Sequence, residues 1–111
     1  MSVVTQALVL GVGALWNATG LRLLGRWMVA RAGSGNDGVR RLALIMLVRA
    51  GDRGVDAVTA AYERGSTSTE LPRVLASIES ADARDALRRL TEHHDEAVRR
   101  AAQDVLGEAA S

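Results

Sequence analysis

A short sequence pattern occurs twice in this chain. Val39-Arg40-Arg41-Leu42-Ala43 and Val98-Arg99-Arg100-Ala101-Ala102 each follow an acidic residue in a turn-like segment, and each opens a long run with helical apolar spacing. Internal repetition constrains the fold strongly, because a repeat unit that cannot bury its own apolar face must stack against the next unit. The sequence therefore predicts a stack of helix pairs.

The composition agrees with closely packed helices. Hydrophobic residues make up 48% of the 111 residues, but only Trp16, Trp27 and Tyr62 are aromatic, so aliphatic side chains and Ala must fill the core. A chain of this length is expected to form one domain, residues 1–111. The absence of cysteine excludes disulfides, thiolate metal sites and cysteine nucleophiles.

Apolar spacing predicts about seven helices and an all-α fold. The expected repeat units span residues 3–33, 36–65 and 69–93, and a terminal helix spans residues 95–109. Residues 7–14 match residues 43–50 at a constant offset of 36, so the N-terminal segment is expected to be a further copy of the same helix. A turn is expected at residues 17–20.

Residues that favour helix ends lie between the predicted helices. The expected N-caps are Asn36 or Asp37, Ser80 and Asp95. Helices are expected to end at Gly51 and Gly65, and Pro72 suits a first helical turn. Residues 36–50 are apolar on more than one side, which predicts a central helix covered by several neighbours.

Two segments resemble a HEAT repeat of the bacterial, phycobilisome-lyase-like type. Residues 81–109 carry a short helix, a His-Asp turn, Asp95-x-x-Val98-Arg99-Arg100 and a closing Val105-Leu106-Gly107, and residues 36–65 resemble a second copy. The resemblance implies a short right-handed α-solenoid and an interaction scaffold. Fold analogy alone says little about any one function.

The resemblance also implies a ladder of charged contacts between neighbouring repeats. In HEAT-like proteins of this type, the turn acid and the Arg after Val tend to join one repeat to the next. By resemblance, these residues are Asp95 and Arg99 in the last unit, and Arg40 with Asn36 or Asp37 in the second. The second unit departs from the pattern, because Asn36 occupies the position of the acid.

Charge is distributed unevenly along the chain. Residues 1–50 contain six arginines and one acid, Asp37, whereas residues 51–111 contain eight arginines and twelve acids. A basic and apolar N-terminal half suits contact with anionic lipid or an acidic protein surface. Nucleic acid is not an expected partner, because the chain as a whole is nearly neutral and acids lie among the C-terminal arginines.

One cluster, residues 93–96 (His-His-Asp-Glu), contains residue types used in metal binding and acid-base catalysis. Adjacent side chains on a helix do not face one another, and the chain has no other His to complete a metal site. The pattern is typical of a polar turn with Asp95 as N-cap. We therefore expect no enzymatic activity, no cofactor and no metal.

The function that the sequence favours is binding through the N-terminal helix pair. An apolar helix with few polar residues leaves an uncovered apolar patch, which usually marks a partner site. We expect residues 3–28 to dock onto another protein or a second copy of this chain. The residues expected to make this contact are Val4, Leu8, Trp16, Leu21, Leu24, Trp27 and Met28.

An alternative is a membrane anchor. Residues 3–21 carry no charge and are followed by Arg22, Arg26 and Arg31, so this segment can be read as a span that presents the HEAT-like part to the cytoplasm. Polar residues and glycines reduce its strongly apolar part to residues 7–16, a length typical of a buried helix. The arginine-only, alanine-rich composition suggests a bacterium, and the expected location is the cytoplasm or the cytoplasmic face of the inner membrane.

Overall fold

The chain folds entirely into helices joined by short turns. The computed structural model describes residues 2–19 and 22–110, apart from the side chains of residues 2, 17–19, 109 and 110, and these residues form seven helices and no strand. The helices are α1 (Ser2–Thr19), α2 (Arg22–Ala32), α3 (Asp37–Arg49), α4 (Asp52–Glu63), α5 (Leu71–Ser77), α6 (Ala81–Leu90) and α7 (Glu96–Ala110). The predicted all-α class and the predicted number of helices are confirmed.

The predicted helix starts and stops are present. Asn36, Ser80 and Asp95 each accept a hydrogen bond from the backbone N–H three residues further on, at 3.0, 3.1 and 3.1 Å. Gly51 and Gly65 follow α3 and α4 with φ angles of 62° and 97°, the left-handed region that glycine adopts without strain. These local signals divide the chain into its helices.

α1 continues further than the sequence predicted. The expected turn at residues 17–20 is wrong for its first three residues, because α1 runs to Thr19. Neither Asn17 nor Thr19 is a strong helix breaker, since each destabilises a helix by less than about 1 kcal/mol relative to Ala.

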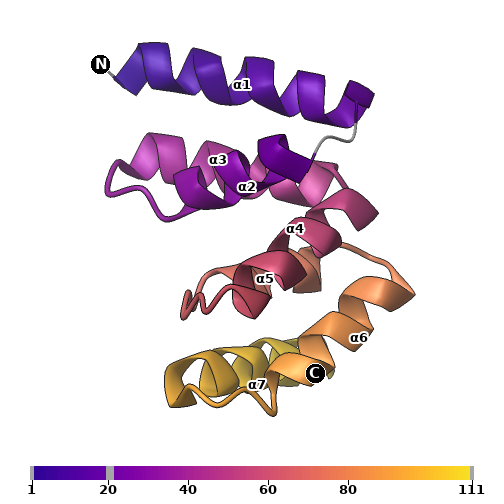
Figure 1. Cartoon of the computed structure of the whole chain (residues 1–111). Helices are drawn as coiled ribbons and strands as arrows, with labels where there is room; N and C mark the ends of the chain where they lie inside the picture. Colours follow the sequence, from indigo (N-terminus) through magenta and orange to yellow (C-terminus); the bar gives the residue numbers. More distant parts are fainter. Residues whose placement is uncertain (1, 20–21, 111) are drawn as a thin grey trace.

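Helices close in sequence are also neighbours in space. Each helix packs against the next helix and the next but one, and among the described residues no helix packs against one further away in the chain. The contacts trace two columns, one of α1, α3, α5 and α7 and one of α2, α4 and α6. Figure 1 shows α1 lying across one end and α7 at the other.

α3 is the central helix, as predicted. It packs against α1, α2, α4 and α5, and it contributes Val39, Ala43, Met46 and Leu47 to the core. Among its large apolar side chains only Ile45 is exposed, at 45%. A helix that is apolar on most sides needs neighbours on most sides, and the stack supplies four.

α4 approaches α3 closely at Gly54. This residue is buried in the first turn of α4, where an added Cβ would collide with the carbonyl oxygen of Leu47 in α3 and lie 3.3 Å from Cδ1 of Ile78. A backbone carbonyl cannot move aside without shifting its helix. The spacing of α3 and α4 therefore depends on the missing side chain.

We predict that Gly54→Ala destabilises the protein by about 1–3 kcal/mol, because the added methyl group overpacks the α3–α4 contact. Gly11→Ala is the matched control, since a Cβ at Gly11 in α1 meets no atom within 4 Å. That change is expected to stabilise the fold by up to roughly 1 kcal/mol through helix propensity. Urea unfolding followed by far-ultraviolet circular dichroism measures both, and equal effects at the two sites would contradict this packing.

Candidate functional site

The outward side of α1 is apolar along its described length. All of its exposed residues with described side chains lack charge, and we call them together the α1 outer face: Val3, Val4, Ala7, Leu8, Leu10, Gly11, Ala14 and Leu15. The five large side chains among them are exposed by 50% to 74%. Val4, Leu8 and Leu15 project the same way, because spacings of four and seven residues return to one side of a helix.

The inward side of α1 is packed into the core. Val9 and Trp16 are buried, and an added Cβ at Gly13 would lie 2.7 Å from Sδ of Met46 in α3. The ring of Trp16 lies against Gly25 of α2, where an added Cβ would be 3.2 Å from Cζ2. α1 is therefore held on the stack by one face and leaves the other face uncovered.

The opposite end of the stack has a different surface. The exposed residues of α7 include Glu96, Arg100, Gln103, Asp104 and Glu108, and the Arg100 guanidinium lies 3.0 Å from the Glu96 carboxylate. α7 therefore presents a polar, charged face, whereas the exposed side chains described on α1 carry no charge.

Two of the predicted contact residues lie on the α1 outer face. Val4 and Leu8 are 66% and 54% exposed. The prediction omitted Val3, Leu10 and Leu15, which are exposed beside them. The spacing of Leu15, seven residues after Leu8, was the signal available for finding it.

The other predicted contact residues are less accessible or lie elsewhere. Trp16 and Met28 belong to the core and are not part of the exposed surface. The Trp16 ring packs against Gly25 of α2, and Met28 packs against α1 beside Gly13. Leu24 and Trp27 are half-buried against the core. Leu21 lies outside the described residues.

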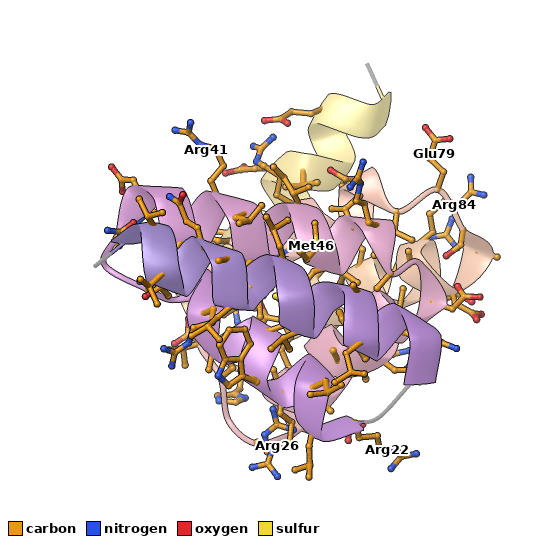
Figure 2. The ribbon with its side chains drawn as sticks, turned by 90° about the horizontal axis from the view of Figure 1, so that it is seen from above. Arg22, Arg26, Arg41, Met46, Glu79 and Arg84 are labelled. Atoms are coloured by element: carbon orange, nitrogen blue, oxygen red, sulfur yellow. The ribbon has the colours of Figure 1, made fainter. Side chains whose placement is uncertain are left out.

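Arginines flank α1 on both sides. Seen from above in Figure 2, Arg22 and Arg26 project on one side of α1 and Arg41 on the other. All three are exposed, and none forms an ion pair with another described residue. No acid occurs before Asp37, and that carboxylate lies 2.7 Å from the Arg40 guanidinium. The apolar face therefore has a basic rim.

A groove of about 580 Å³ lies between α2 and α4. Its charged lining comprises Arg22, Arg26, Arg53, Arg64, Asp56 and Glu63. The Arg53 guanidinium crosses toward α1 and donates to the backbone oxygen of Trp16 at 3.2 Å. A groove with four arginines and two acids is basic, and two of its arginines also belong to the rim of the α1 outer face.

The sequence-predicted ladder residues do not share one arrangement. Arg40 reaches toward the next unit, with its Nε 3.7 Å from the Glu70 carboxylate just before α5. Arg99 instead turns back and donates to the backbone oxygen of His93 at 3.0 Å, while Asp95 caps its own helix. Asp95 and Arg99 therefore both stabilise the turn before α7, Asp95 through a helix N–H and Arg99 through a backbone carbonyl.

The His93 turn is packed against α4. The Nδ1 of His93 accepts a hydrogen bond from the N–H of Asp95 at 3.0 Å, and the ring lies edge-on to Tyr62 at 5.5 Å. The Tyr62 hydroxyl donates to the backbone oxygen of Ser68 at 2.5 Å, and burial raises the pKa of Tyr62 well above its usual range. Within residues 2–19 and 22–110, no group of three or more His, Asp or Glu side chains is placed to hold a metal ion.

Among the helices that the structure describes, none is both long enough and apolar enough to cross a bilayer.

Comparison with protein-family models, with curated proteins and with solved structures finds no match for this chain.

We predict that Asp95→Ala destabilises the protein by about 1 kcal/mol, because the N–H of Val98 loses its capping acceptor. Asp95→Asn is expected to retain nearly all of the stability, since Asn and Asp cap equally well. The urea unfolding midpoints of the two variants measure the difference. If Asn is as costly as Ala, the charge of Asp95 matters, and the residue acts in a ladder and not as a cap.

Proposed function

We propose that this protein is a non-enzymatic interaction module of HEAT-like repeats, a short right-handed α-solenoid that docks onto another macromolecular surface through the α1 outer face. The α-solenoid is supported by the order of packing, in which the backbones of the described helices approach only helices one or two places away, although the Arg53 side chain of α4 also reaches α1. That order is the one expected when repeat units stack on their neighbours.

The equivalence of two helix starts supports the repeat. α3 and α7 belong to the same column and begin with the same hydrogen bonds: Asn36 and Asp95 cap the N–H groups of Val39 and Val98, and both valines are buried. The backbone N–H groups of Asn36 and Asp95 also bind a side chain two residues earlier, the Oγ of Ser34 or the Nδ1 of His93. The N-termini of α3 and α7 therefore share the same pattern of hydrogen bonds.

The observation that carries the docking function is the α1 outer face. Five large aliphatic side chains remain half exposed or more on one helix, with no charged residue between them. A contiguous apolar surface of this kind usually marks a site that another surface covers. Covering the remaining exposed area of these side chains is worth on the order of 1 kcal/mol each, enough to offset part of the cost of association.

The test is a photo-cross-linking amino acid placed at Leu8, in the α1 outer face, and in a second variant at Gln103, on the polar face of α7. Both positions are exposed, so neither substitution disturbs the core. In cells that produce the protein, we expect adducts from position 8 at a yield at least about tenfold that from position 103. Mass spectrometry of the adducts shows whether the covering molecule is a protein, a second copy or a lipid.

The comparison of the two positions is decisive because it does not require the partner to be known in advance. Equal yields at both positions, or adducts from neither, would show that the α1 outer face is not covered in the cell and would overturn the docking function. Circular dichroism of each variant verifies that its helices are intact.

A further inference from the structure

The two halves of the chain carry opposite net charge. Six arginines and one acid give residues 1–50 a net charge of +5, and eight arginines and twelve acids give residues 51–111 a net charge of −4. Residues 1–50 contain α1 to α3 and residues 51–111 contain α4 to α7. The apolar outer face therefore lies in the basic half, and the partner that best complements it is anionic.

A second copy of this chain is a poor match for the same face. A symmetric dimer through α1 would bring together two N-terminal halves, each of net charge +5, with Arg22, Arg26 and Arg41 of each copy around one contact. Like charges placed around an interface oppose association. Charge complementarity therefore favours a different, negatively charged surface.

The chemistry of the α1 outer face favours lipid over an acidic protein. Its eight residues offer only aliphatic side chains, alanines and a glycine, with no side-chain hydrogen-bond donor or acceptor. Protein interfaces carry about one hydrogen bond per 100–200 Å², whereas the acyl region of a bilayer needs none.

The depth of the arginines also fits a bilayer. α1 lies across the end of the stack, and α2 and α3, which carry the rim arginines, lie one helix layer behind it (Figure 1). Packed helix axes are about 8–10 Å apart, and an interfacial helix sinks about 5–10 Å into the boundary between headgroups and acyl chains. With α1 at that depth, the guanidinium groups of α2 and α3 come to the level of the phosphates, which arginine binds in a bidentate manner.

We infer that the α1 outer face docks in the plane of an anionic lipid bilayer, with Arg22, Arg26 and Arg41 binding the lipid phosphates. This inference rests on the proposed docking function and specifies its partner. α1 lies along the membrane surface and does not cross it. The polar α7 end faces the aqueous phase.

The experiment uses the absence of cysteine from the chain. Leu8→Cys and, as the matched control, Gln103→Cys are each labelled with an environment-sensitive dye and mixed with vesicles of phosphatidylcholine containing about 30 mol% phosphatidylglycerol. We expect a blue shift of the dye at position 8 and none at position 103. Vesicles of phosphatidylcholine alone are expected to bind at least about tenfold more weakly.

Two sets of variants separate the apolar contact from the charge contact. Leu8→Glu is expected to weaken vesicle binding by at least about tenfold, whereas Gln103→Glu, which changes the net charge equally, leaves it unchanged. Arg22→Gln and Arg26→Gln are expected to weaken binding about fivefold each, and Arg88→Gln, in the acidic half, is the charge-matched control. Raised salt should weaken the binding that depends on the arginines.

The outcomes are distinguishable from a failure of the docking function. No vesicle binding, or binding with no blue shift at position 8, overturns the bilayer contact. If position 8 still cross-links to a protein in cells, the docking function stands and its partner is that protein. A doubled mass in light scattering without lipid, lost in Leu8→Glu, identifies a second copy and likewise overturns the bilayer contact.

Discussion

Burial of apolar helix faces against neighbours one or two places away in the chain is the interaction on which the rest of the structure depends. α3 shows it most clearly, because it buries side chains against four helices and has no need of a long-range partner. This packing between near neighbours leaves α1 and α7 at opposite ends, and each presents a helix face that no other described helix covers.

The sequence predicted those parts of the fold that depend on interactions between residues close together in the chain. The caps Asn36, Ser80 and Asp95, together with Gly51 and Gly65, fix helix boundaries by hydrogen bonds or φ angles within a few residues, so short patterns suffice to place them. The central position of α3 was predictable for a similar reason. A helix that is apolar on most sides has to be surrounded.

The direction in which α1 faces was not predictable in the same way. In a helix with one polar and one apolar side, the sequence predicts which side is buried. In α1, Val9 and Leu10 are equally apolar, and only the packed structure shows that Val9 is buried and Leu10 half exposed. Trp16 and Met28 were assigned to the surface for this reason, although large side chains gain most from burial. The close approach of α4 to α3 at Gly54 also depends on tertiary packing. A single glycine in the sequence does not predict which helix will pack against it.

The separation of charge along the chain determines which end of the molecule an anionic surface attracts. The exposed apolar face of α1 lies in the basic half. From α1 to α7 the first column takes three steps of about 8–10 Å each, whereas the Debye length at physiological ionic strength is about 8 Å. The acidic half therefore adds little repulsion when the basic half meets an anionic surface, even though the whole chain carries a net charge of only +1. A uniform mixture of the same residues would lose that attraction, so the order of charges along the chain, and not their sum, sets which end docks.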